Sequence, residues 1–157
     1  MDVHINVVTL IQGMLAPAVM ISACGLLLLG MNNKYSLVVN RIRLLNEEKR
    51  KFTSKAGEKS FSYEEEIRVT SIDTQLTRLQ ERVLLVRNAV LCYSLAVALF
   101  VVTSFLIGLA FLLDITGLDV FVVIAFTLGM LLVLCGIAFA FLETKRGYEI
   151  VRYEIEA

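Results

Sequence analysis

The sequence predicts an all-α integral membrane protein with three transmembrane helices and a long cytoplasmic antiparallel helical hairpin between the first and the second. Three observations predict this class. Hydrophobic residues make up 57% of the 157 residues, and the mean hydropathy of +0.74 is too high for a soluble domain of this size. The apolar residues gather in three uncharged stretches, each long enough to cross a bilayer. The basic residues all lie outside these stretches.

The distribution of the basic residues predicts the direction in which the chain crosses the membrane. Of the 15 lysines and arginines, twelve lie in segment 32–88 and three lie after residue 142. The N-terminal segment and the turn at 114–119 have none. Because segments rich in lysine and arginine stay in the cytoplasm, we expect the N-terminus outside, segment 32–88 inside, the turn outside and the C-terminus inside.

Residues 1–10 are predicted to be a short outer lead-in, and the first span follows at 11–31. This span has 21 residues without a charge, which is about 31 Å of helix and matches the hydrocarbon thickness of a bilayer. It is also the least lipid-like span, because it contains Gln12, Pro17 and Ser22. Polar groups are unfavourable against hydrocarbon, so we expect these residues to face protein or a water-filled pore.

Segment 32–88 is predicted to be a helical hairpin with its tip at 53–61. Apolar residues recur every three or four positions along both arms, which is typical of helices that pair through a heptad seam. Ser62 and Glu65 form a capping box that predicts the start of the second arm. We expect a coiled-coil stalk of about 30 Å. The seam consists of Tyr35, Val38, Ile42, Leu45 and Phe52 on the first arm and Val69, Ile72, Leu76, Leu79, Val83, Val86 and Val90 on the second.

The other two apolar stretches predict a second span at 89–113 and a third at 120–142, joined by a tight outer turn at 114–119. Small residues recur every seven positions in the second span, which favours contact with another helix over a water-lined wall. Residues 143–157 are predicted to be a charged cytoplasmic tail with a weakly apolar face that can pack on the stalk. The small-residue stripe consists of Ala89, Ala96, Thr103 and Ala110, and the face of the tail consists of Tyr148, Val151 and Ile155.

The spans contain no aspartate, glutamate, lysine, arginine or histidine. Such residues mark proton relays and coupled transport, so their absence argues against a proton-coupled transporter. The chain also has no glycine-rich phosphate loop, no cluster of metal ligands and no nucleophile paired with a base. We therefore expect no enzyme activity, no cofactor, no metal and no nucleic-acid partner. The three cysteines fall one in each span, which favours a packing role over a disulfide.

Three groups of residues are candidates for function. Basic residues beside the membrane either form a collar for anionic lipid headgroups or only orient the chain and solvate the stalk. Polar and small residues in the spans line a pore or lie at helix interfaces, and two aspartates form an outer acidic rim that favours cations. The collar is Lys34, Arg41, Arg43, Arg78, Arg82 and Arg87; the pore or interface candidates are Gln12, Pro17, Ser22, Thr103 and Thr127; the rim is Asp114 and Asp119.

The small residues of the spans predict that the chain associates with copies of itself. One hypothesis is a homo-oligomeric ring around a central ion-conducting pore. The alternative is a membrane-anchored scaffold or adaptor whose hairpin and tail bind an unidentified protein. The expected partners are therefore further copies of the chain, membrane lipids with anionic headgroups and, in the second hypothesis, that protein.

A proline, a run of leucines, a tyrosine after an asparagine and a paired Arg-x-Arg follow one another from the first span into the stalk. In this pattern the sequence resembles a bacterial family of small membrane proteins, the domain of unknown function 2721 family. Lys34 departs from it, because an arginine-like neighbour of the tyrosine is common there. The resemblance implies three spans in a bacterial inner membrane and brings no activity. The matching residues are Pro17, Ser22, Leu26–Leu29, Asn33, Tyr35, Arg41 and Arg43.

The order of the predicted elements is also similar to that of the proton-channel stator subunits of the ExbB and TolQ kind, in topology and not in sequence. Those subunits form rings around a pore. Thr103 and Thr127 lie where such proteins place pore threonines, but no span of this chain has the matching acidic residue. A likeness of layout carries little function, so it implies a ring and not proton flow.

Overall fold

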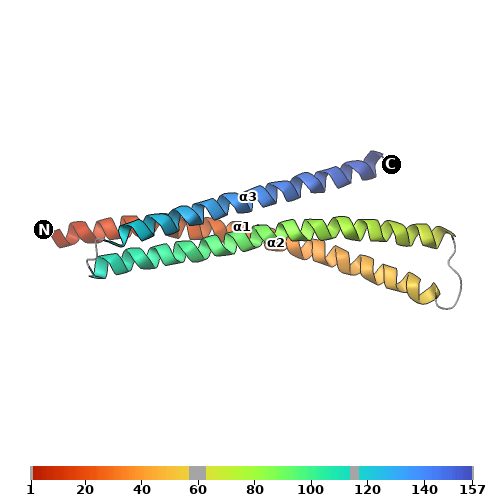
Figure 1. Cartoon of the computed structure of the whole chain (residues 1–157), viewed down its shortest axis with the longest axis horizontal. Coiled ribbons are helices and arrows are strands. Elements are labelled where there is room, and N and C mark those ends of the chain that lie inside the picture. Colours follow the sequence, from red (N-terminus) through yellow and green to blue (C-terminus); the bar gives the residue numbers. More distant parts are fainter. Residues whose placement is uncertain (1, 57–62, 114–116, 157) are drawn as a thin grey trace.

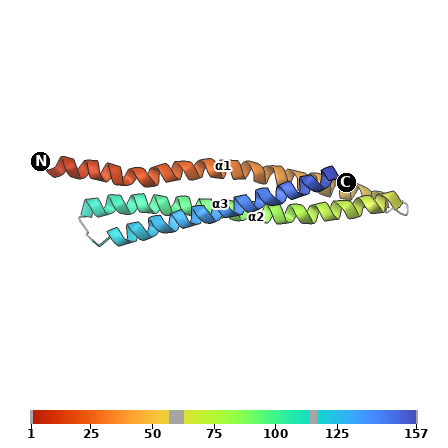
Figure 2. The same ribbon diagram turned by 90° about the horizontal axis from the view of Figure 1, so that it is seen from above.

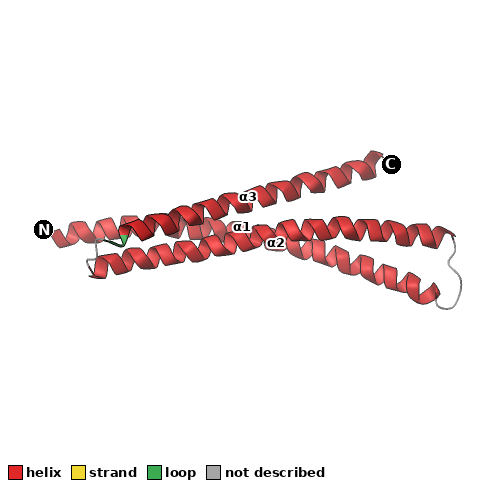
Figure 3. Ribbon diagram, viewed as in Figure 1, coloured by secondary structure: helices red, strands yellow, loops and turns green. Residues whose placement is uncertain are grey.

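Three long helices make up the protein in the computed structural model (Figure 1), which describes residues 2–56, 63–113 and 117–156. Figure 3 shows that helix dominates the described residues, with a short loop before the third helix. All three helices are long and apolar enough to cross a membrane, which confirms the all-α class and the three predicted apolar helices. The helices are α1 (Asp2–Ala56), α2 (Tyr63–Leu113) and α3 (Asp119–Glu156).

Helix α1 unites segments that the sequence analysis separates. It contains residues 2–10 of the lead-in, the first apolar stretch and the first arm of the hairpin without an interruption. Pro17 lies inside this helix, where it removes one backbone hydrogen bond. Residues 53–56 of the predicted tip are still helical, whereas Ser62 of the predicted capping box lies outside the described residues.

Helix α2 is the central element of the structure. It runs opposite to α1 and α3 and packs against both, whereas α1 and α3 make few direct contacts (Figures 1 and 2). The N-terminus of α1 lies at the same end of the molecule as the C-terminal end of α2 and the start of α3, and the C-terminal end of α1 lies with the start of α2 at the opposite end. The C-terminal part of α3 diverges from α2 in Figure 1. The side chains of the predicted tail face, Tyr148, Val151 and Ile155, lie outside those that the structure describes.

The small-residue stripe of α2 lies at the centre of the core. Ala89 and Ala96 are fully buried and Thr103 is 1% exposed, so the expected contact with other helices is confirmed. These small side chains let α1 and α3 approach α2 closely. Each of the three cysteines is free. The core consists of Cys24, Met31, Val86, Ala89, Tyr93, Ala96, Phe100 and Val133.

Two aromatic rings of α2 lie directly on glycines of α3. A Cβ atom added to Gly136 would come within 2.6 Å of the Tyr93 ring, and one added to Gly129 would come within 2.7 Å of the Phe100 ring. Both distances are far below van der Waals contact, so only glycine fits under either ring. The two ring–glycine contacts hold α2 and α3 at a fixed rotation and axial offset.

Beyond this core, α1 and α2 continue as the two arms of the predicted hairpin. Val38, Leu45 and Ile72 of the predicted seam are buried, and they supply the apolar contact between the arms. Tyr35 is 38% exposed and differs from the pattern, because an aromatic ring with a hydroxyl tolerates water better than an aliphatic side chain.

Two ion pairs also join the arms of the hairpin. Lys49 of α1 binds Asp73 of α2 with an Nζ–Oδ1 distance of 2.6 Å. Arg68 of α2 binds Glu48 of α1 at 2.9 Å. These partners are partly exposed, so each pair contributes about 0–1 kcal/mol. The ion pairs therefore select the register of the arms more than they stabilise it.

Candidate functional site at the junction of the three helices

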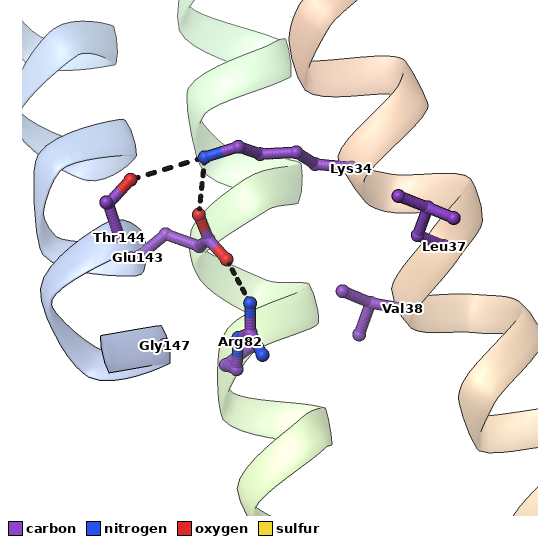
Figure 4. A pocket seen from close by; sticks show the side chains of 7 residues that line it. All are labelled: Lys34, Leu37, Val38, Arg82, Glu143, Thr144 and Gly147. Atoms are coloured by element: carbon purple, nitrogen blue, oxygen red, sulfur yellow. Dashed lines mark hydrogen bonds and ion pairs between the residues drawn. The ribbon is translucent and has the colours of Figure 1, made fainter. Parts of the chain in front are cut away.

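A buried carboxylate links all three helices just beyond the apolar stretch of α3. Glu143 directly follows the predicted span 120–142 and is only 1% exposed. Arg82 of α2 donates a hydrogen bond to its Oε1 atom at 2.6 Å, and Lys34 of α1 donates one to its Oε2 atom at 3.0 Å (Figure 4). Glutamate is almost never buried unless it is paired, and here both carboxylate oxygens have a cationic partner. We call these three residues the junction cluster.

The sequence places the junction cluster where each helix leaves its apolar stretch. Lys34 follows the stretch 11–31 by three residues, and Arg82 precedes the stretch 89–113 by seven residues, which is two helical turns. Because all three helices continue past this level, their polar side chains meet there instead of ending in loops. The cluster therefore marks the boundary between the apolar and the polar part of the bundle.

The charges of the junction cluster favour an ionised glutamate. Burial by itself raises the pKa of the Glu143 carboxyl, but the hydrogen bonds and charges of Arg82 and Lys34 outweigh this, so the pKa lies below its ordinary value of 4.5. The carboxylate is therefore charged at neutral pH. Two cations face one anion, which leaves the junction cluster with one net positive charge.

A pocket of about 200 Å³ opens beside the junction cluster. Leu37 and Val38 of α1 supply its apolar wall, and Thr144 and Gly147 of α3 line the opposite side (Figure 4). The Thr144 hydroxyl accepts a hydrogen bond from Lys34 at 3.2 Å and donates one to the Ala140 carbonyl at 3.0 Å. The pocket thus combines one apolar wall with the polar groups of the cluster.

The guanidinium of Arg82 lies against the backbone of α3. A Cβ atom added to Gly147 would come within 3.2 Å of its Nη2 atom, so the glycine leaves the room in which the guanidinium sits. The Nε atom of Arg82 is buried and has no hydrogen-bond partner in the part of the chain that the structure describes. A buried donor without a partner is unfavourable by about 1–3 kcal/mol, so this N–H is available to an acceptor.

A second pocket, of about 220 Å³, lies among the apolar parts of the three helices. It brings together three of the predicted pore or interface residues, Pro17, Thr103 and Thr127. Both threonine hydroxyls donate within their own helices at 2.8 Å, to the carbonyls of Leu99 and Val123. The remaining lining is apolar or glycine, so this pocket has no charged group that could bind an ion.

The other predicted site residues lie apart from both pockets. Gln12 and Ser22 are exposed on α1, and the Ser22 hydroxyl donates to the Ala18 carbonyl at 3.2 Å. Asp119 is exposed at the start of α3, whereas Asp114 lies outside the described residues. The remaining members of the predicted collar are exposed and belong to neither pocket: Arg41, Arg43, Arg78 and Arg87.

The role of Glu143 was not predicted from the sequence. An acid directly after an apolar stretch is typical of the first solvated residue of a tail, so Glu143 was expected in the charged segment 143–157. One signal could have found it. Glu143 is the acid that lies closest to the membrane on the side where lysine and arginine dominate, and an acid at such a position needs cationic partners.

A further ion pair flanks the junction cluster at the surface. Arg146 of α3 donates to Glu81 of α2 at 3.0 Å, and their side chains are 51% and 62% exposed. This pair joins the same two helices as the bond between Arg82 and Glu143. It lies in water and is therefore a natural comparison for the buried interaction.

Comparison with known proteins places the chain in a family. No curated protein and no solved structure gave a match. The family model described as protein of unknown function (DUF2721) matches residues 14–153. This range contains the first apolar stretch from residue 14 onward, the whole of the other two stretches and every residue of the junction cluster. The chain therefore belongs to the DUF2721 family, as its resemblance in the first span and stalk had indicated.

Proposed function

We propose that this protein is a homo-oligomer of the bacterial inner membrane whose subunits form a ring around an ion-conducting pore. Its N-terminus and the turn between α2 and α3 face outward, and the hairpin and the C-terminus face the cytoplasm. The confinement of lysine and arginine to one end of the bundle supports this orientation. The observation that carries self-association is a small-residue face of α1 that no described residue of the chain covers.

This face consists of Ala18, Ser22 and Gly25, which lie four and three residues apart and therefore on the same side of the helix. All three residues are exposed, and a Cβ atom added to Gly25 would meet nothing within 4 Å. In contrast, Gly129 and Gly136 lie under rings of α2. Small residues on an uncovered face allow a second helix to pack closely against α1, and a second copy of the chain is the partner that is always present.

The interior of one chain is filled by α2, so a pore requires several copies. Thr127 of α3 and Gln12 of α1 are exposed polar residues that such a pore could present to water. Thr103 is excluded from the proposed pore wall, because it is buried inside the chain. Asp119 is exposed at the outer end of α3 and would form the rim that favours cations.

The mass of the particle in lipid nanodiscs tests the self-association. We expect wild-type protein to form a particle of several subunits and a Gly25→Leu variant to shift towards the monomer, because leucine prevents close approach of the helices. Gly30→Leu is the matched control, since a Cβ atom at Gly30 also meets nothing within 4 Å but residue 30 lies about 140° around the helix from residue 25. A monomeric wild-type protein, or equal loss in both variants, contradicts the assembly.

Ion flux into liposomes tests the pore separately. We expect wild-type oligomers to release a cation gradient faster than empty liposomes do. The Gly25→Leu variant at equal protein density should lose this activity together with its assembly. If a confirmed oligomer conducts no faster than empty liposomes, the pore is wrong although the assembly stands.

A scaffold or adaptor is the second candidate function, and one observation favours it. The hairpin arms are closed on each other by their own apolar seam and two ion pairs, so they form a self-contained projection that a cytoplasmic protein can bind. Exchange of residues 46–66 for an unrelated helical hairpin tip distinguishes the two functions. An adaptor loses its bound proteins in a pull-down, whereas a pore keeps them and changes its conductance.

A further inference from the structure

We propose that the pocket beside the junction cluster binds a phosphate group, supplied by the headgroup of a membrane lipid or by free phosphate. The inference goes beyond the proposed pore, because one chain contains the whole pocket. Of the six residues in the predicted collar, the structure brings only Lys34 and Arg82 together at this pocket. A discrete site formed by these two residues therefore replaces a diffuse ring of charge.

The charge of the junction cluster favours an anion. Lys34 and Arg82 carry two positive charges, and Glu143 neutralises one of them. The neighbouring charges of Glu81 and Arg146 cancel each other. The pocket therefore keeps one net positive charge, and the Lys34 side chain is 46% exposed, so an anion can reach it from outside.

Unused hydrogen-bond donors at the pocket match the oxygens of a phosphate group. A lysine ammonium has three N–H groups, and Lys34 uses two of them, on Glu143 and Thr144. The Nε–H of Arg82 has no partner within the described chain. Hydrogen bonds from lysine and arginine to phosphate are charge-assisted and strong. After a small shift of the Arg82 side chain, the oxygens of a phosphate in the pocket would accept from both donors.

The space and the position of the pocket fit the same ligand. Its volume of about 200 Å³ is far above the 10–15 Å³ that about one water molecule requires. Leu37 and Val38 line one wall, which suits the glycerol and the first methylenes of a lipid. The junction cluster lies at the boundary between the apolar and the polar part of the bundle, which is the level at which lipid phosphates lie in a bilayer.

Glu143 limits how the phosphate can bind. Its carboxylate repels an anion, so the phosphate approaches from the exposed side of Lys34 and not from the side of the carboxylate. Glu143 is thus a positioning residue, because it holds Lys34 and Arg82 together across three helices. Without Glu143, the positive charges of Lys34 and Arg82 would repel each other in the pocket when no phosphate is bound.

Binding of three soluble probes to the purified full chain in neutral detergent tests the proposal. Dioctanoyl phosphatidic acid carries a phosphate and two acyl chains, dioctanoylglycerol carries the same chains without phosphate, and inorganic phosphate carries no chains. We expect saturable binding of phosphatidic acid and none of dioctanoylglycerol at equal concentration. Binding of inorganic phosphate as tight as that of phosphatidic acid identifies free phosphate as the ligand, and much weaker binding identifies the lipid.

Two variants and one control locate the binding. Lys34→Gln should weaken phosphatidic acid binding about fivefold or more, as expected for the loss of one basic residue near the membrane. Its fold is preserved by the remaining pair of Arg82 and Glu143, which a melting curve without ligand checks. Gly147→Ala changes no charge and should also weaken binding, because its methyl group displaces the guanidinium of Arg82. Lys145→Gln removes an equal charge from an exposed residue two positions from Glu143 and should bind as wild type does.

Three results would overturn the site. They are equal binding of phosphatidic acid and dioctanoylglycerol, equal weakening by Lys34→Gln and Lys145→Gln, and the absence of binding by every phosphate probe. None of them depends on whether the protein assembles or conducts, so failure of the site and failure of the pore remain distinguishable.

Discussion

The substitution Glu143→Gln tests the junction cluster most sharply, because it removes one charge and almost no volume. In the wild-type protein the two carboxylate oxygens accept from Arg82 at 2.6 Å and from Lys34 at 3.0 Å. A glutamine amide has a single oxygen and offers an NH₂ group in place of the other. One cation therefore loses its acceptor and faces a donor, and the two positive charges are no longer neutralised.

The expected loss of stability follows from the burial of the three partners. A hydrogen bond to a charged group contributes about 1.5–3 kcal/mol, and Glu143 is almost fully buried. Arg82 and Lys34 are 25% and 46% exposed, so water screens part of their repulsion. We therefore expect a loss of about 2–3 kcal/mol, which lowers the Tm of a chain of this length by about 4–12 °C.

Thermal unfolding of the purified variants in one detergent measures this effect. Glu81→Gln is the matched control, since it makes the same chemical change in the pair with Arg146 on the same two helices. Both partners of that pair are more than half exposed, so we expect a change of about 0–1 kcal/mol. If the Tm of Glu143→Gln equals that of Glu81→Gln, the buried cluster does not stabilise the bundle and the reasoning fails.

Three further predictions follow from particular residues. Because pairing lowers the pKa of Glu143 below 4.5, its stabilisation is complete above that pH and disappears as the pH falls through the folded-state pKa; the Tm difference between wild type and Glu143→Gln should therefore be constant near neutral pH and close in acid. Gly136→Ala should lower stability in thermal unfolding by about 1–3 kcal/mol, because its Cβ would lie 2.6 Å from the Tyr93 ring, whereas Gly30→Ala, whose Cβ would meet nothing within 4 Å, should not destabilise. Asp119→Asn should reduce the preference of the liposome flux for cations over anions, and an unchanged preference argues against the outer rim.

Hydropathy was sufficient to predict the three helices. An uncharged run as long as a bilayer is thick has few other stable solutions, so all three apolar stretches appear in the structure as helices. The same holds for the stripe of Ala89, Ala96 and Thr103, which a seven-residue period assigns to one face of α2. Periodicity shows on which face of a helix the small residues gather, and in α2 that face is buried in the core.

The contacts between helices could not be predicted in the same way. Periodicity does not say how far one helix slides or rotates against another. That offset is set by the fit of Tyr93 and Phe100 onto Gly136 and Gly129, and a glycine in a span looks the same in the sequence whether a ring covers it or not. Gly25 and Gly136 have similar sequence surroundings and opposite structural roles.

The junction cluster was hidden for a related reason. Lys34, Arg82 and Glu143 are separated by 48 and 61 residues in the sequence, and only the continuity of all three helices past the apolar stretches brings them together. The predicted collar included Lys34 and Arg82, because both lie close to a span in the sequence. It missed the acid that joins them, since the rule for membrane orientation considers only basic residues.

The orientation of the chain in the membrane underlies the proposed pore, its acidic rim and the cytoplasmic hairpin. Labelling of single cysteines with a membrane-impermeant maleimide in intact cells tests it directly, in a chain whose three native cysteines are replaced by alanine. We predict that Asp119→Cys is labelled from outside, whereas Glu66→Cys is labelled only after the inner membrane is permeabilised. The reverse pattern, or labelling of both residues from the same side, would contradict the account.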